Sequence, residues 1–182
     1  MDNLTETKLT SEKIYSGCIL DFYRDTVRLP NGGTAPRELS RHVGAVCIVP
    51  LLDDGRVIVE RQFRYPVNEV ITEIPAGKRD SRDEAPEAAA HRELREETGL
   101  RLTAITHVLP PAACTVGIGD ERTVCVFGTA EGTFRPSADP MEEIESAWYT
   151  RAQVRALHET DLFGSCALAY SWMFANGCLP GV

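Results

Sequence analysis

The sequence has no hydrophobic run long enough to cross a membrane, because its apolar stretches fall well short of the ~20 residues that a spanning helix needs. The N-terminal segment MDNLTETKLTSEK is polar and charged, and it lacks the apolar core of a signal peptide. We therefore expect no membrane partner and a cytoplasmic location.

An excess of positive charge is also missing. The 19 Lys and Arg residues are outnumbered by 27 Asp and Glu residues, which gives a net charge of −8. Nucleic-acid backbones are bound by basic surfaces, so this balance argues against a nucleic-acid partner. It is compatible with an acidic active site that recruits divalent cations to accept a phosphorylated substrate.

Clustered metal-binding thiols and imidazoles are absent as well. The six cysteines are scattered without CxxC spacing, and the four histidines show no ligand spacing. Cys47 and Cys125 stand in apolar runs that read as buried strands. We interpret most of the cysteines as reduced core residues in a cytosolic protein.

The first 42 residues predict an antiparallel β-ribbon. Residues 14–29 and 34–42 alternate loosely and flank the strong turn signal Pro30-Asn31-Gly32-Gly33. An isolated hairpin is marginal in water, so the ribbon must pack on something, and a second subunit is the expected partner. We therefore divide the chain into an N-terminal ribbon, residues 1–42, and a main domain, residues 43–182.

The main domain alternates strand patterns with two helix patterns. Strands before and after one central helix, with a second helix at the end, predict helices packed on a mixed sheet. The expected fold is α+β, an αβα sandwich. Strands are expected at residues 43–52, 56–63, 70–74, 100–109, 122–129 and 145–149, and helices at residues 84–98 and 164–175.

The central helix pattern brings three carboxylates together. Residues 84–98 are rich in helix formers, and Gly99 stands where a left-handed C-cap falls. Glu93, Glu96 and Glu97 then lie within an arc of roughly 100° near the C-terminus, where they repel one another and oppose the helix dipole. The candidate N-caps are Asp80, Ser81 and Asp83.

Two interpretations of these carboxylates remain open from helix chemistry alone. A bound divalent cation would cancel the repulsion, because hard ions prefer carboxylate oxygens. Alternatively, the carboxylates form a solvated acidic face in which Arg92 and Arg95 provide internal ion pairs.

The order of residues in GKRDSRDEAPEAAAHRELREETGL resembles the Nudix box. That motif is a glycine, five residues, a glutamate, seven residues, and then Arg-Glu-apolar-any-Glu-Glu-any-Gly-apolar. Residues 92–100 match every fixed position, and Glu84 stands seven residues before Arg92. Six residues separate Gly77 from Glu84, which places one extra residue in the loop before the helix.

A wider resemblance, over roughly residues 11–172, is to the ADP-ribose pyrophosphatase group of Nudix hydrolases. It implies a Nudix-type sandwich, dimerisation through the ribbon, and metal-dependent hydrolysis of ADP-ribose to AMP and ribose 5-phosphate, or of a related nucleoside diphosphate sugar. Val116 replaces the marker proline of that group. The segments that carry the resemblance are residues 14–17, 29–32, 37–38, 42–46, 62–64, 73–77 and 115–121.

Val116 and the extra loop residue keep other functions open. One is the hydrolysis of another nucleotide, such as a sugar nucleotide or an oxidised nucleotide. Another is a catalytically silent Nudix-like domain that binds a nucleotide as a sensor. The complete pattern of residues 92–100 favours the enzyme, because a purely binding domain would be free to lose it.

The resemblance implies roles for the helix residues and for a loop glutamate. Glu93 and Glu97 are the expected ligands of Mg²⁺ or Mn²⁺, with the backbone carbonyl of Ala76 completing the site. Glu96 is a ligand or an adjacent base, and Arg92 orients the carboxylates. We also expect a further ligand or base from a mobile loop, with Glu142 favoured and Glu143 second.

Four more residues are expected to bind the small-molecule substrate. Arg37 on the ribbon and Arg64 at a strand end suit a diphosphate, because guanidinium forks match phosphate oxygens. Glu73 and Glu121 are expected to orient ribose hydroxyls, or to bind arginine or metal.

Overall fold

The computed structural model describes residues 4–17, 20–52 and 54–179, so Cys18 and Asp53 lie outside the described residues. The chain forms two compact units. The first unit comprises Met1–Val43 and Ala113–Arg122, and the second comprises Gly44–Ala112 and Thr123–Val182.

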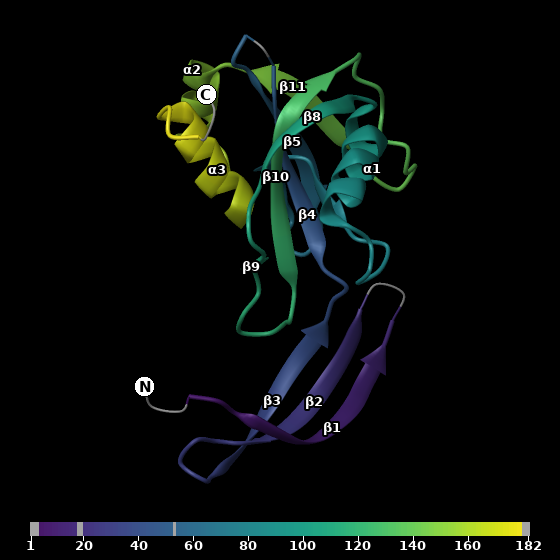
Figure 1. Cartoon of the computed structure of the whole chain (residues 1–182), viewed down its shortest axis with the longest axis vertical. Coiled ribbons are helices and arrows are strands. Elements are labelled where there is room, and N and C mark those ends of the chain that lie inside the picture. The colour runs from purple at the N-terminus through teal and green to yellow at the C-terminus, as the bar shows by residue number, and fades with distance from the viewer. Residues whose placement is uncertain (1–3, 18–19, 53, 180–182) are drawn as a thin grey trace. The chain divides into compact units, whose positions relative to one another are not determined.

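The N-terminal unit is built on a three-stranded antiparallel sheet with the order β1-β2-β3 (Figure 1). Its strands are β1 (Thr7–Ser16), β2 (Asp21–Arg28) and β3 (Thr34–Arg41). The predicted antiparallel ribbon is confirmed, but the prediction of one extended arm over residues 14–29 was wrong. The chain turns after Ser16, where the Gly17 N–H donates to the Leu20 carbonyl at 3.0 Å.

The second unit contains a mixed eight-stranded sheet with the central order β11-β5-β4-β10-β8. Strands β4 and β10 are parallel, and the other described strand pairs are antiparallel. The short strands β7 and β9 were not predicted. The strands are β4 (Ala45–Leu51), β5 (Val57–Arg64), β6 (Glu69–Glu73), β7 (Ala76–Lys78), β8 (Arg101–Val108), β9 (Ala112–Ala113), β10 (Arg122–Glu131) and β11 (Ile144–Tyr149).

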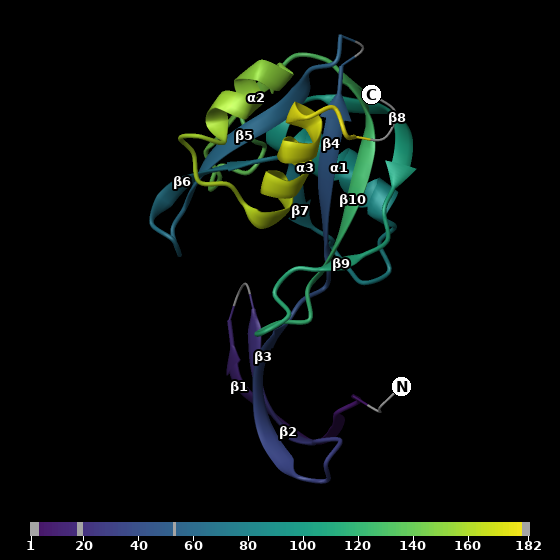
Figure 2. The same cartoon turned by 90° about the vertical axis from the view of Figure 1, so that its left-hand side faces the viewer.

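Helices cover both faces of this sheet (Figures 1 and 2). Helix α1 (Pro86–Thr98) packs on one face, and α2 (Arg151–Leu157) and α3 (Ser165–Ala175) pack on the other. The predicted αβα sandwich with a mixed sheet is therefore confirmed. Within the described ranges, no helix is long and apolar enough to span a membrane.

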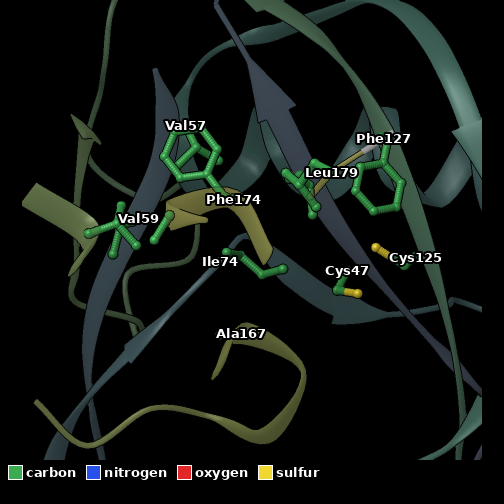
Figure 3. Close-up of a cluster of buried hydrophobic side chains, with 12 residues drawn as sticks. Cys47, Val57, Val59, Ile74, Cys125, Phe127, Ala167, Phe174 and Leu179 are labelled. Carbon is green, nitrogen blue, oxygen red and sulfur yellow. The ribbon is translucent and has the colours of Figure 1, made fainter. Parts of the chain in front are cut away.

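The core under α3 is a cluster of aliphatic, aromatic and sulfur-containing side chains (Figure 3). Cys47 and Cys125 are buried thiols within it, as predicted. They are register partners on the parallel strands β4 and β10. Cys178, in contrast, is exposed and does not belong to the core.

The start of α1 differs from the prediction. The helix begins at Pro86 with Ala85 as its N-cap, and no side chain caps it. Proline at the first helical position fixes φ and lacks the N–H that a cap would satisfy. Asp80, Ser81 and Asp83 are therefore not caps, and the Ser81 hydroxyl instead accepts from the backbone N–H groups of Asp83 and Glu84.

Helix α2 was not predicted, although its start carries a sequence signal. Thr150 and Gln153 form a capping box, in which the Thr150 hydroxyl accepts from the Gln153 N–H at 3.3 Å. The Gln153 side chain in turn accepts from the Thr150 N–H at 2.9 Å. The Thr-x-x-Gln spacing is a known start signal for a helix, but seven residues are too few for a clear apolar period.

Candidate active site

Helix α1 is oriented by its apolar stripe. Ala89, Ala90 and Leu94 are fully buried against the sheet. Gly99 ends the helix with φ of 76°, and its N–H donates to the Arg95 carbonyl at 2.9 Å, so the predicted left-handed C-cap is confirmed. With the apolar stripe fixed on the sheet, the direction of every other side chain on the helix is set.

The three carboxylates of the predicted cluster do not share one environment. Glu93 and Glu97 are buried, with 9% and 6% of their surfaces exposed, whereas Glu96 is exposed. A solvated acidic face therefore does not describe Glu93 and Glu97. Their positions four residues apart place both side chains on the same edge of α1.

The buried carboxylates contact strand β7, just before the loop that leads to α1. The Ala76 N–H donates to Glu97 Oε2 at 3.1 Å. The Glu93 carboxyl group lies directly over Gly77, so closely that a Cβ at Gly77 would overlap it. Strand β7 itself is held by antiparallel pairing with β4. The two carboxylates thus extend from α1 and rest against a strand that is itself held in the sheet.

Arg92 connects several acidic groups around this site. Its Nη1 lies 2.8 Å from Glu93 Oε1 and 3.1 Å from Glu96 Oε2. The other side of the guanidinium binds the Glu84 carboxylate, with Nη2 at 3.1 Å from Oε2. Nη2 also donates to the Lys78 carbonyl at 3.1 Å. Arg92 therefore connects Glu93 and Glu96 to the loop before the helix.

The sequence analysis missed a further buried carboxylate, that of Glu60 on β5. Only 3% of Glu60 is exposed, and its Oε1 accepts from the Ser146 hydroxyl on β11 at 2.9 Å. The signal was present, because Glu60 directly follows the apolar run Val57-Ile58-Val59. A carboxylate inside a buried strand is rare unless it is paired.

Burial and mutual repulsion raise the pKa values of the carboxylates in this cluster. For Glu97 the larger cause is burial, and the charges of Glu60 and Glu93 add to it. Burial also raises the pKa of Glu60 and that of Glu93. The Arg92 guanidinium opposes the shift at Glu93 only in part. The ionised forms of these carboxylates are therefore disfavoured unless a positive charge compensates them.

Glu142 lies within electrostatic reach of this cluster. It is exposed in the segment before β11, and its charge contributes to the raised pKa values of Glu60, Glu93 and Glu97. Glu142 and Glu143 line a hollow of about 570 Å³, and Phe63 of β5 is another of its lining residues. Glu142 remains the favoured loop glutamate, with Glu143 beside it in the same lining.

The predicted substrate residues divide between the two units. Arg64 and Glu73 pair across the β5–β6 hairpin, with Arg64 Nε 2.7 Å from Glu73 Oε2. Arg37 belongs to the N-terminal unit, where its guanidinium pairs with Glu6. Glu121 belongs to the same unit, in a segment that also contains the exposed Val116.

The donor set fits a hard divalent cation. Glu97 Oε2 lies against the Ala76 N–H and the Glu93 carboxyl group lies over Gly77, and carboxylate oxygens are ligands that such ions prefer. No group of three His, Cys, Asp or Glu side chains in the described part of the chain is already arranged as a metal cage. Arg92 pairs with two of the carboxylates, those of Glu93 and Glu96.

Comparisons with known proteins agree with this geometry. The family model described as NUDIX domain matches residues 41–167. A Bacillus subtilis (strain 168) protein described as an ADP-ribose pyrophosphatase is 43% identical over 108 residues, 59% of this chain and 58% of that protein. The chain thus matches less than two thirds of that relative's length.

A Mycobacterium tuberculosis protein with the same description is 35% identical over 165 residues, covering 88% of this chain and 79% of that protein. Among solved structures, "Crystal structure of ADP compounds hydrolase" superposes with a TM-score of 0.77, covering 96% of this chain and 97% of that one. The sequence identity to that structure is 21%, so it supports the fold alone.

Proposed function

Because the chain belongs to the NUDIX family, we propose that it hydrolyses the diphosphate bond of ADP-ribose to AMP and ribose 5-phosphate, or that bond in a related nucleoside diphosphate sugar. Two relatives described as ADP-ribose pyrophosphatases support this substrate class. The observation that carries the proposal is the pair of buried carboxylates, Glu93 and Glu97, held against β7.

The proposed cofactor is Mg²⁺ or Mn²⁺, within the divalent-metal use that is general in this family. Glu93, Glu97 and Glu142 and the carbonyl of Ala76 are the residues that would hold it. A bound divalent cation neutralises charge on the phosphoryl oxygens and lowers the pKa of the attacking water. A cation here would compensate the ionised carboxylates, whose charged forms are otherwise disfavoured by burial and mutual repulsion.

The proposed reaction is a displacement at phosphorus. The water oxygen bonds to one phosphorus, and the bond from that phosphorus to the bridging oxygen breaks. The bridging oxygen leaves as part of the other phosphate group. The proton of the attacking water passes to a carboxylate, either that of the loop glutamate, with Glu142 favoured and Glu143 second, or that of Glu96. Arg92 keeps Glu93 and Glu96 in position throughout.

Arg64 and Arg37 are the proposed diphosphate ligands. Glu73 already holds the Arg64 guanidinium in one orientation, which reduces the side-chain entropy lost when a phosphate binds. Glu73 and Glu121 are proposed to orient ribose hydroxyls. These assignments rest on residue chemistry and on the resemblance of the surrounding segments.

We also propose that residues 1–42 form a dimerisation element. All ten residues of β1 are exposed in the single chain, and its sheet has only three strands. The exposed residues of β1 include the large apolar side chains Leu9, Ile14 and Tyr15, which offer a surface for a partner. Sedimentation analysis at working concentration tests this proposal. A single monomeric species would exclude dimerisation.

A second candidate substrate is another diphosphate-linked nucleotide, such as a sugar nucleotide or an oxidised nucleotide. The observation that favours it is Val116, which replaces the marker proline and is 79% exposed. A catalytically silent sensor is less favoured, because it would not need Arg92 to hold Glu93 in place.

The proposal is tested by incubating the purified protein with Mg²⁺ or Mn²⁺ and a substrate panel. The panel contains ADP-ribose, sugar nucleotides, dinucleotides and nucleoside triphosphates, and phosphate release is read after a phosphatase chase. Preferential cleavage of ADP-ribose supports the first candidate. Cleavage of another member reassigns the substrate, and silence across the panel would favour the sensor.

A further inference from the structure

A second hollow of about 720 Å³ lies beside the carboxylate cluster, on the adjacent side of α1. One stripe of the helix lines it, formed by residues at spacings of three and four that include His91, Arg92, Arg95, Glu96 and Gly99. Arg135, from the segment after β10, lines the facing side. The hollow is therefore formed by the same helix as the proposed active site.

Positive charge dominates the lining of this hollow. Three arginines, Arg92, Arg95 and Arg135, line it together with one acidic residue, Glu96. Such a concentration of cations is unusual in a chain with a net charge of −8. Glu96 is already paired with Arg92, so the charges of Arg95 and Arg135 remain uncompensated locally.

Arg95 and Arg135 have no acidic partner within the described ranges. Neither guanidinium makes a hydrogen bond or ion pair to any residue that the structure describes. Some surface arginines, such as Arg101 and Arg24, pair with a glutamate, so Arg95 and Arg135 differ from these in keeping their charges unpaired. Two unpaired guanidinium groups facing one hollow suit an external anion with several oxygens.

Arg135 is held firmly at this place. Its backbone N–H donates to the Thr98 carbonyl at 2.9 Å, at the end of α1. Its side-chain stem lies over Gly99, where an added Cβ would come within 2.8 Å of the Arg135 Cβ. The neighbouring Ala138 N–H donates to the Glu96 carbonyl at 2.8 Å. The Arg135 guanidinium is therefore carried by an anchored backbone and by an aliphatic side chain that packs on Gly99.

We propose that this hollow, between the Arg95 side of α1 and Arg135, binds a terminal phosphate group. A phosphomonoester or inorganic phosphate carries close to two negative charges near neutral pH and offers three strong acceptor oxygens. Two guanidinium forks match this anion in charge and geometry. Cleavage of a diphosphate bond yields two phosphomonoesters, so a reaction product is one source, a point that rests on the proposed function.

The site is tested by isothermal titration calorimetry with metal-free protein and inorganic phosphate, at constant ionic strength set with KCl. Wild type is expected to show saturable binding. Arg95→Gln and Arg135→Gln are each expected to weaken it about tenfold, the effect of losing one charged hydrogen-bonding group. Arg135→Gln keeps the backbone bond to Thr98, so the segment stays anchored.

Arg101→Gln is the matched control, because it removes the same charge from an exposed strand outside the hollow. It is expected to bind phosphate as wild type does. Absence of saturable binding by wild type, or equal weakening by Arg101→Gln, would overturn the proposal. Unfolding temperatures of all variants verify that the fold is intact.

Competition identifies the source of the phosphate. Ribose 5-phosphate or AMP that displaces inorganic phosphate with the same dependence on Arg135 supports a product as ligand. Displacement by neither supports free phosphate as ligand. Because hydrolysis is not measured, a failure of this site is distinguishable from a failure of the proposed activity.

Discussion

The carboxyl group of Glu93 fills the space that a side chain at Gly77 would need. Gly77 lies on β7, and its φ is not in the left-handed region, so its backbone conformation is open to other residues. The glycine is therefore required by the close approach of a carboxylate and not by backbone strain. It links the first position of the box to the helix that follows.

Gly77→Ala tests this contact. The added methyl group is expected to displace the Glu93 carboxylate, which lowers kcat by about 100-fold through misplacement of a catalytic group. The free energy of unfolding should fall by roughly 1–3 kcal/mol because the site becomes overpacked. Steady-state kinetics and thermal unfolding measure the two effects. Gly117→Ala, whose Cβ would meet no atom within 4 Å, should leave the unfolding temperature unchanged.

Arg92→Lys tests the orienting role of the guanidinium. An ammonium group cannot span Glu84, Glu93 and Glu96 at once, as the guanidinium does. We expect kcat to fall by about 10- to 100-fold with little change in KM, in line with the loss of a supporting residue around a metal site. Arg101→Lys replaces an exposed partner of Glu131 and serves as the control. A kcat equal to that of wild type in Arg92→Lys would exclude the role.

The pH dependence of stability tests the electrostatics of the cluster. Burial raises the pKa of Glu60 in the folded protein above its unfolded value. The resulting stabilisation is present below the unfolded pKa and is lost as the pH rises through the folded pKa. In metal-free protein, the free energy of unfolding of wild type should therefore fall relative to Glu60→Gln by roughly 1–3 kcal/mol between about pH 5 and pH 8.

Glu60→Gln keeps the acceptor for the Ser146 hydroxyl, so the comparison isolates the charge. Glu69→Gln, at an exposed position on β6, is the control and should show the pH dependence of wild type. Chemical denaturation in the presence of a chelator gives the free energies. If the free energies of unfolding of wild type and Glu60→Gln depend on pH in the same way, ionisation of Glu60 does not destabilise the folded protein.

Thr98→Val tests the end of α1. The buried Thr98 hydroxyl donates to the Leu94 carbonyl and accepts from the Leu100 N–H at 3.0 Å. Valine has a similar shape but leaves the Leu100 N–H without this acceptor. The free energy of unfolding should therefore fall by about 1–3 kcal/mol. Thr103→Val, at an exposed position on β8, should change stability by less than about 0.5 kcal/mol. Thermal unfolding of the two variants checks the difference.

The sequence predicted the sandwich well, because long periodic segments such as α1 carry strong signals. It placed Glu93, Glu96 and Glu97 on one helix edge, but periodicity could not show that only Glu96 faces solvent. Glu60 was missed because its burial depends on packing between β5 and β11, which are distant in sequence. The start of α1 was misplaced because the helix begins at Pro86, after all three candidate caps, and no side chain caps it.

The most direct test of the central claim is the turnover of ADP-ribose by Glu97→Gln in the presence of Mg²⁺. Glu97 is buried against the Ala76 N–H, and the amide would keep its size but lose its charge. Glu87→Gln, at an exposed position in the first turn of α1, is the control. The account predicts a loss of kcat on the order of 100-fold or more in Glu97→Gln with an unchanged or higher unfolding temperature. Turnover close to that of wild type would contradict it.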